Sequence, residues 1–154
     1  MDVNKANFGG VDLFSLTDSW NEAEVARLPA RTLAYVGDAV YDLGLRLNHV
    51  RLGIDGAGRL HDSLVNLVNS SAQAKVFDLI FPELPEADQQ MVKTWRNAKI
   101  PSRYGSGTRG EYARATALEA WVGYLFLTRQ NERLAAIFEI VSGQAGRGEN
   151  EQEA

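Results

Sequence analysis

Apolar residues recur at intervals of three and four through most of the 154-residue chain, and no segment alternates apolar and polar residues between hairpin turns. Spacings of three and four place side chains on one face of an α-helix, whereas strict alternation is typical of a half-buried strand. A chain of this length suits one domain around one core. The sequence therefore predicts an all-α fold, a single bundle of helices.

Five helices can be placed by this periodicity. The first follows Pro29, and we expect its apolar stripe to face the core. The members of this stripe are Leu33, Val36, Val40, Leu43, Leu47 and Val50. Further helices are expected over 59–80, 85–99, 112–128 and 132–141, with a polar, glycine-rich loop before the fourth. The fourth, YARATALEAWVGYLFLT, is apolar nearly all round, which indicates a helix at the centre of the domain.

The charge of the chain is unevenly distributed. Residues 1–24 form an acidic N-terminal segment with five acids and one lysine, and we expect 143–154 to be a disordered acidic tail. The folded domain then spans 25–142. Within it, residues 93–114 carry six Lys or Arg side chains and one Glu, although the whole chain has a net charge of −4. This basic segment is either a solvated face or a strip that contacts phosphates.

Several classes of site and location are disfavoured by composition. The chain has no cysteine and two histidines, His49 and His61, so any metal is expected to be held by oxygen. Its N-terminus lacks the features of a signal peptide, and no apolar stretch is long enough to span a bilayer. These features predict a cytoplasmic protein without a membrane partner.

Glu119 is the only ionisable residue between Ala115 and Leu127. A buried carboxylate costs several kcal/mol unless it is paired or bound to a metal. Glu119 is therefore either the partner of a buried arginine or a metal ligand.

Asp38 lies on the helix that follows Pro29, well away from the centre of the apolar stripe. It follows Gly37, a residue that weakens a helix unless another backbone or a ligand comes close. Asp38 is either a solvated surface acid or a ligand. Asp42 shares its face, and its spacing favours an ion pair with Arg46 over a ligand role.

Four blocks of sequence, in order, resemble the Mini-ribonuclease III family, a branch of ribonuclease III without the double-stranded-RNA-binding domain. The blocks are LAYVGDAVYD (33–42), RLHDSLVNLVNSSAQAKV (59–76), RNAK (96–99) and YARATALEAWVGYLFL (112–127). The resemblance implies a dimeric, all-α endonuclease domain over 25–142. It further implies Mg²⁺ as the cofactor, for which Mn²⁺ can substitute, and double-stranded RNA as the substrate, cut to 5′-phosphate and 3′-hydroxyl ends.

The typical task of the family is maturation of ribosomal RNA precursors, chiefly the 23S large-subunit precursor. A ribosomal protein that presents this RNA is a further candidate partner. Carried over by position, Asp38 and Glu119 match the two acids that are catalytic residues and metal ligands. The wider superfamily has further acids where this chain has Arg31, Ala34 and Thr116, so the resemblance implies a reduced metal site.

The basic segment supplies most candidates for contacts to RNA phosphates, because it precedes the helix that carries Glu119. The candidates are Lys75, Arg96, Lys99, Arg103, Arg109 and Arg114. The alternative to an Mg²⁺-dependent endoribonuclease is a non-catalytic RNA-binding or ribosome-associated module on the same fold. Ala34 and Thr116 favour that alternative, whereas the retained Asp38 and Glu119 speak against it. A plain helical adaptor with a solvated basic face is a third reading.

Overall fold

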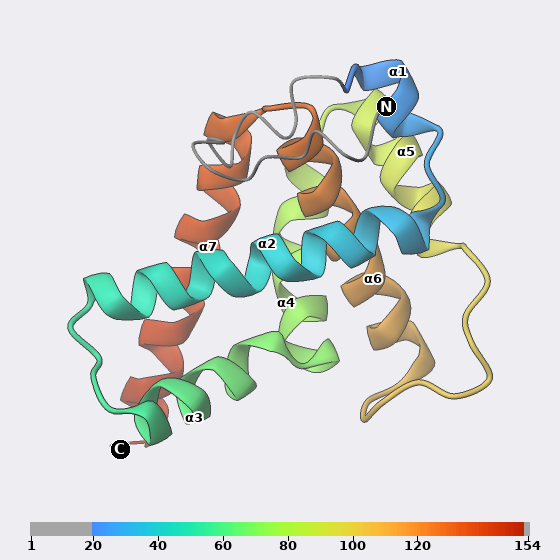
Figure 1. The fold of residues 1–154 in the computed structure, drawn as a ribbon. Coiled ribbons are helices and arrows are strands. Elements are labelled where there is room, and N and C mark those ends of the chain that lie inside the picture. Colours follow the sequence, from blue (N-terminus) through green and yellow to red (C-terminus); the bar gives the residue numbers. More distant parts are fainter. Residues whose placement is uncertain (1–19, 153–154) are drawn as a thin grey trace, which may run out of the picture.

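The computed structural model describes residues 20–152, and all regular structure in that range is helical. The helices are α1 (Glu22–Ala26), α2 (Ala30–Arg51), α3 (Ala57–Val68), α4 (Ser70–Ile80), the 3₁₀ turn η3 (Phe81–Glu83), α5 (Glu86–Arg96), α6 (Arg109–Leu127) and α7 (Asn131–Gln152). In Figure 1, α2 crosses in front of α6 and α7, and α3 runs below it. The predicted all-α class is confirmed for these residues.

Helix α6 lies at the centre of the bundle, as its composition predicted. It packs against α2, α4 and α5, and ten of its nineteen residues are buried. A capping box starts it, because Thr108 accepts from the Glu111 amide and Glu111 accepts from the Thr108 amide. The helix therefore begins at Arg109, three residues before the predicted start at 112, since T-x-x-E is a start signal.

Helices α2 and α6 make the most extensive helix contact of the fold, and two glycines allow it. A methyl group on Gly37 would overlap the Glu119 carbonyl oxygen, and one on Gly123 would overlap the Leu33 carbonyl oxygen. The close approach that the sequence suggested at Gly37 is thus made by another backbone. This crossing brings Asp38 and Glu119 to the same place in the fold.

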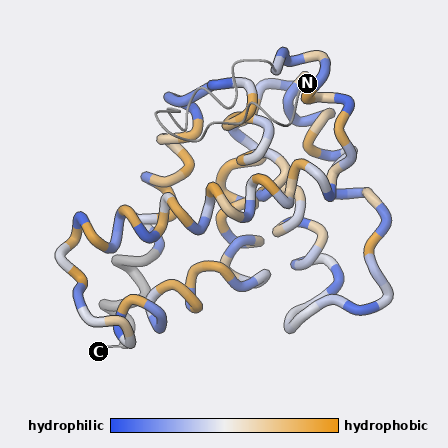
Figure 2. Tube along the Cα trace, in the orientation of Figure 1, coloured by the Kyte–Doolittle hydropathy of each residue, from blue (hydrophilic) through white to orange (hydrophobic). Residues whose placement is uncertain are grey.

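The prediction that the apolar stripe of α2 faces the core is confirmed for Leu33, Val36 and Val40 and is wrong for its C-terminal half. Leu43, Leu47 and Val50 are 47%, 58% and 66% exposed. Besides Leu33, the buried residues of α2 are Ala34, Gly37, Tyr41, Leu45 and His49, which the stripe did not include. Close backbone contact with α6 requires small residues at the crossing, so the larger residues are left outside. Hydrophobic positions accordingly recur along all of α2 in Figure 2.

The single helix predicted over 59–80 is two helices, and Asn69 separates them. Its backbone is extended, with φ −72° and ψ 157°. Its side chain accepts a hydrogen bond from the Ala72 amide at 2.9 Å and donates to carbonyl groups at the end of α3. Asparagine is a favoured N-cap, and one side chain here ends α3 and begins α4.

Helix α7 continues through Gly143 to Gln152, into the segment 143–154 that the sequence predicted as a disordered acidic tail. No proline lies between 131 and 152, and extending a helix costs less than starting one. Residues 153–154 of the tail and 1–19 of the acidic N-terminal segment lie outside the described residues. No helix of the described part is both long and apolar enough to cross a membrane.

Candidate active site

Asp38 and Glu119 come from different helices and meet where α2 crosses α6. Asp38 is exposed and Glu119 is half-buried, so the pair lies at the edge of the core and within reach of solvent. Asp38 directly follows Gly37, whose backbone lies against the Glu119 carbonyl group. The separation of the two carboxylates is therefore set by backbone packing.

The electrostatics of Glu119 are those of a carboxylate without a positive partner. Burial and, to a smaller extent, the nearby Asp38 carboxylate together raise the pKa of Glu119 from 4.5 to about 7. The Gln73 side chain acts in the opposite direction, since its Nε2 donates to Glu119 Oε1 at 3.1 Å. No arginine pairs with Glu119 among the described residues, so the buried ion pair considered from the sequence is not formed.

Gln73 is a site residue that the sequence analysis missed. It lies on α4 and is 2% exposed, between buried residues of the same helix. A buried amide needs a hydrogen-bond partner, and here that partner is the Glu119 carboxylate. A glutamine on the inner face of the predicted helix was the available signal.

Tyr41 lies one turn after Gly37 on the inner face of α2. Its hydroxyl is fully buried and has no hydrogen-bond partner among the described residues. Burial raises the pKa of Tyr41, and the charge of Glu119 raises it further, so the two groups are close and the hydroxyl stays protonated at neutral pH. The hydroxyl is a free donor and acceptor beside the carboxylate pair.

The residues present fit a divalent cation held by oxygen. Two adjacent carboxylates oppose each other's ionisation, and a cation between them removes that opposition. Mg²⁺ is often held by one or two carboxylates together with waters and substrate phosphates. The described residues contain no group of three or more His, Asp or Glu side chains that could hold a metal, so Asp38 and Glu119 would be its two protein ligands.

The other candidate ligands from the sequence lie apart from this pair. Arg46 Nε donates to both Asp42 carboxylate oxygens at 3.2 Å, which confirms the predicted ion pair. His49 is buried on the inner face of α2 and His61 is exposed on α3, and neither belongs to a metal-binding group among the described residues.

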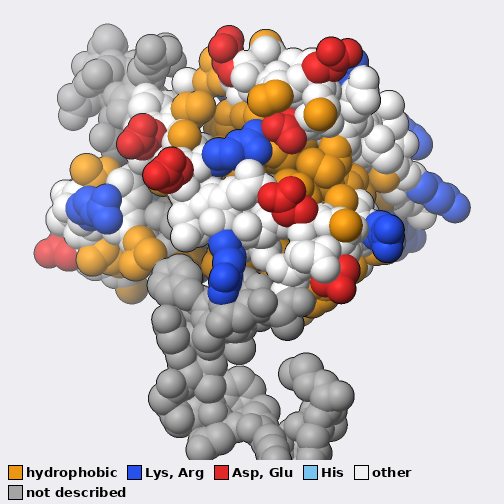
Figure 3. Space-filling view, turned by 90° about the horizontal axis from the view of Figure 1, so that it is seen from above, with side chains coloured by type: hydrophobic (Ala, Val, Ile, Leu, Met, Phe, Trp, Pro, Cys, Tyr) orange, Lys and Arg blue, Asp and Glu red, His pale blue; other side chains and the backbone are white. Residues whose placement is uncertain are grey.

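The end of α5 and the connection that follows bring Arg96 and Lys99 of the basic segment to the starts of α2 and α6. Arg103, Arg109 and Lys99 are exposed, as is Lys75 on α4. Figure 3 shows Lys and Arg side chains at the right-hand edge of the molecule, the side on which this connection lies in Figure 1. The Tyr104 ring packs on the Tyr112 ring of α6, with centroids 5.4 Å apart, which anchors the connection.

Two of the predicted phosphate contacts are already engaged within the protein. Arg114 Nη1 lies 2.6 Å from Asp78 Oδ2 on α4, and the guanidinium of Arg96 lies 5.6 Å from the centre of the Phe81 ring. Trp95, which lies within the basic segment, is buried against Trp121 and Tyr124 and is a core residue.

An all-helical domain with two adjacent carboxylates at a helix crossing and exposed cations in the connection before one of these helices has features expected of a helical nuclease. Comparison with known proteins gives the family. The ribonuclease III domain matches residues 31–130. The chain belongs to this family and is an endoribonuclease of the ribonuclease III type. Enzymes of the family act on double-stranded RNA and generally depend on a metal ion.

Individual relatives cover most of the chain. A Mini-ribonuclease 3 from Symbiobacterium thermophilum is 37% identical over 122 residues, which are 79% of this chain and 94% of the relative. One from Brevibacillus brevis is 38% identical over 117 residues, 73% and 87% of the two chains. The crystal structure of protein FN1578 from Fusobacterium nucleatum has a TM-score of 0.70 and 29% identity, covering 77% of this chain and 94% of its own. These comparisons confirm the resemblance stated from the sequence.

Proposed function

We propose that this protein is an Mg²⁺-dependent endoribonuclease that cuts double-stranded RNA at Asp38 and Glu119. The observation that supports it best is the meeting of these two carboxylates at the α2–α6 crossing, where burial and mutual repulsion raise the Glu119 pKa to about 7. A divalent cation would stabilise the ionised form of two adjacent carboxylates, one of which is partly buried without a positive side chain beside it.

Asp38 and Glu119 would hold the ion, and Gln73 would orient Glu119 through its hydrogen bond to Oε1. When bound, Mg²⁺ supplies positive charge that stabilises the transition state at the scissile phosphate. A water attacks the phosphorus, the bond to the 3′ oxygen breaks, and the products carry 5′-phosphate and 3′-hydroxyl ends. Mn²⁺, which also accepts oxygen ligands, would substitute.

The exposed cations of the basic segment and Lys75 would bind phosphates on either side of the cut. An A-form duplex offers phosphates and 2′-hydroxyls in its minor groove, and its major groove is too narrow for side chains. Recognition would therefore depend on duplex shape, and affinity would fall steeply with salt. The strongest candidates are the exposed Lys75, Lys99, Arg103 and Arg109, because Arg114 is paired with Asp78 and Arg96 contacts the Phe81 ring.

We propose a homodimer formed through the exposed apolar face of α2. On α2, Tyr35, Leu47 and Val50 are 83%, 58% and 66% exposed, and Leu52, directly after the helix, is 65% exposed. A patch of this kind marks an interface, and a second copy is the occupant that a two-stranded substrate requires, since each copy then cuts one strand. Asp38 lies on the same helix, so the two sites would line one valley.

The Mini-ribonuclease 3 names of the relatives support a substrate of structured cellular RNA. We place a ribosomal RNA precursor, in particular the end of the 23S precursor, first among the substrates to test. A ribosomal protein would present that RNA if the purified enzyme cuts it poorly alone.

The test is cleavage of a long RNA duplex with Mg²⁺ or chelator, beside Asp38→Asn and Glu119→Gln. We expect metal-dependent cutting of the duplex but not of a single strand, and loss of cutting in both variants. A matched control is Asp42→Asn, because Asp42 is paired with Arg46 and should not affect cleavage. Binding of duplex or precursor RNA without cleavage of either would favour a non-catalytic module, for which Ala34 and Thr116 speak.

A further inference from the structure

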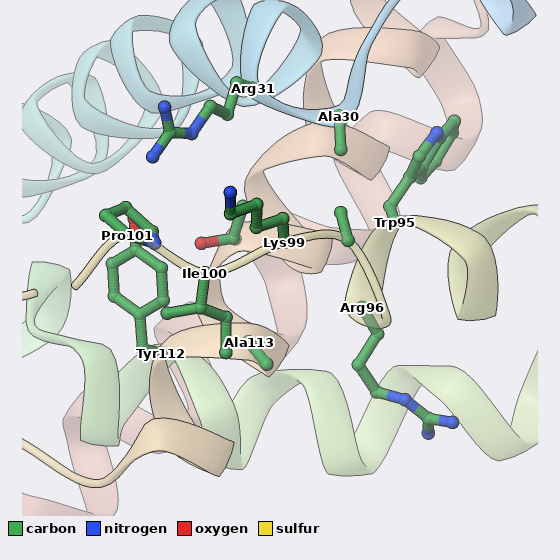
Figure 4. A pocket seen from close by; sticks show the side chains of 11 residues that line it. Ala30, Arg31, Trp95, Arg96, Lys99, Ile100, Pro101, Tyr112 and Ala113 are labelled. Atoms are coloured by element: carbon green, nitrogen blue, oxygen red, sulfur yellow. The ribbon is translucent and has the colours of Figure 1, made fainter.

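A small open pocket lies between the start of α2, the end of α5 and the start of α6. Three cations line it, and none of the residues lining it is acidic. The lining residues that matter here are Arg31, Trp95, Arg96, Lys99, Tyr112 and Thr116. Figure 4 shows Arg31 and Lys99 reaching over the opening from α2 and from the α5–α6 connection, whereas Arg96 turns away.

Arg31 and Lys99 are both exposed, and neither forms an ion pair with any described residue. Like charges that face each other raise the energy of the site until an anion comes between them. Arg96 differs, because it contacts the Phe81 ring. The pocket therefore offers two uncompensated cations to one anion.

The size and floor of the pocket limit what the anion can be. Its enclosed space of about 20 Å³ accommodates a group about the size of a water molecule. The Tyr112 ring and the Thr116 side chain form part of its wall. A phosphate fits, since one oxygen can enter while the others meet the two cations at the rim.

The pocket also has a fixed relation to the carboxylate pair. Arg31 precedes Asp38 by two turns of α2, and Thr116 precedes Glu119 by one turn of α6. The two helices that carry the carboxylates thus also carry the pocket, one to two helical turns further along. An RNA strand whose scissile phosphate lies at Asp38 and Glu119 would pass the pocket with one of its neighbouring phosphates.

We infer that Arg31 and Lys99 form a phosphate-binding pocket that holds one backbone phosphate of the cleaved strand, a few nucleotides from the cut. This inference rests on the proposed function and adds Arg31, which was not among the phosphate contacts predicted from the sequence. The phosphate held by Arg31 and Lys99 would determine which phosphate of the RNA strand lies at Asp38 and Glu119. Arg31 also stands where the wider superfamily has an acid, so this chain takes an anion at a place where that superfamily carries negative charge.

The test places a neutral methylphosphonate at each phosphate flanking the cut, one at a time, in a short duplex RNA. Single-turnover cleavage with Mg²⁺ and binding in chelator are both measured for wild type, Arg31→Gln, Lys99→Gln and the control Arg27→Gln. Arg27 is exposed, lies four residues from Arg31 and does not line the pocket. At one position the wild type should lose roughly tenfold in binding and rate, the value of a charge-assisted contact.

Arg31→Gln and Lys99→Gln should show that same loss with the normal duplex and no further loss with the neutral linkage at that position. Arg27→Gln should behave as the wild type. If each methylphosphonate lowers binding and cleavage equally in Arg31→Gln and in the wild type, the phosphate-binding role of the pocket is wrong, although the nuclease assignment stands. Failure of the wild type to cut or bind any duplex overturns the proposed function itself, and the pocket with it.

Discussion

Glu119 meets two opposing demands, because its neighbours disfavour the charge that a metal ligand must carry. In the metal-free protein its pKa of about 7 exceeds the ordinary value of 4.5, so the folded state binds its proton more tightly than the unfolded chain does. The free energy of unfolding should therefore fall as pH rises from about 4.5 to 7, by up to about 3 kcal/mol.

Glu119→Gln replaces the titrating carboxyl group with an amide that does not ionise. In chelator, the stability of the variant should therefore no longer fall between pH 4.5 and 7 on account of residue 119. At pH values above about 7 the variant should be more stable than the wild type, since no buried charge remains. Urea denaturation on the acid and alkaline sides of the window measures this, with Glu139→Gln, on the exposed side of α7, as the control. An identical pH dependence in wild type and Glu119→Gln would contradict the environment described for Glu119.

The roles of single residues were readable from the sequence to different degrees. Asp42 was placed with Arg46 because helical spacing alone decides that contact. Glu119 stood out because its helix is otherwise apolar. Gln73 did not, because a glutamine is common on helix surfaces and only the tertiary packing of α4 against α6 buries it.

The crossing of α2 and α6 leaves no room for a side chain at Gly37 or Gly123. Gly37→Ala places a methyl group on the Glu119 carbonyl oxygen, so the helices must separate. We expect a loss of stability of about 1–3 kcal/mol and a loss of cleavage of at least roughly tenfold, because Asp38 moves with the helix. Gly58→Ala on α3 is the matched control, since its methyl group meets no atom within 4 Å.

Thermal denaturation and cleavage rates measure both variants. Gly58→Ala should be neutral or slightly stabilising, as alanine is in an unobstructed helix. Wild-type stability and activity in Gly37→Ala would mean that the helices do not approach as closely as described.

The exposed face of α2 makes its own prediction. Leu47→Glu places a charge in the middle of the proposed interface and should convert the dimer to a monomer. Sedimentation velocity measures the change, and Leu47→Met, which keeps the apolar surface, should remain dimeric. A wild-type monomer at micromolar concentration, or a dimer that survives Leu47→Glu, would remove this face from the interface.

Element positions could be predicted from periodicity, whereas element faces and breaks could not. The stripe on α2 was assigned inward because hydrophobicity does not reveal that Gly37 and Gly123 bring two backbones together. The break at Asn69 was hidden within a continuous apolar pattern, since a single capping side chain suffices to end one helix and start the next.

For the whole molecule, the charge distribution matters more than the net charge of −4. Arg103→Gln with Arg109→Gln should reduce the salt dependence of RNA binding by about one in log–log slope for each phosphate that is no longer neutralised. Arg114→Gln should have a smaller effect, because Asp78 already pairs with Arg114. RNA-binding titrations at several salt concentrations give the slopes. If Arg114→Gln lowers the slope as much per arginine as the Arg103 and Arg109 substitutions do, side-chain exposure does not determine which arginines contact phosphates.

The class of the whole molecule was the most predictable property, since helical spacing and four matching blocks of sequence both indicate it. The pairing of Asp38 with Glu119 was implied only by the family resemblance, and the contact of Gln73 from a third helix was not visible in the sequence. Residues far apart in a chain meet only through packing, which depends on the shapes of many side chains together.

The central claim is that Asp38 and Glu119 jointly hold one divalent ion site, and direct metal binding tests it without any RNA. Mn²⁺ binding is measured by its paramagnetic signal at pH 8, where Glu119 is ionised, for wild type, Asp38→Asn, Glu119→Gln and the double variant. We predict saturable binding that each single substitution weakens by at least roughly tenfold, with little further loss in the double variant. Wild-type binding that persists in both single variants would contradict the claim.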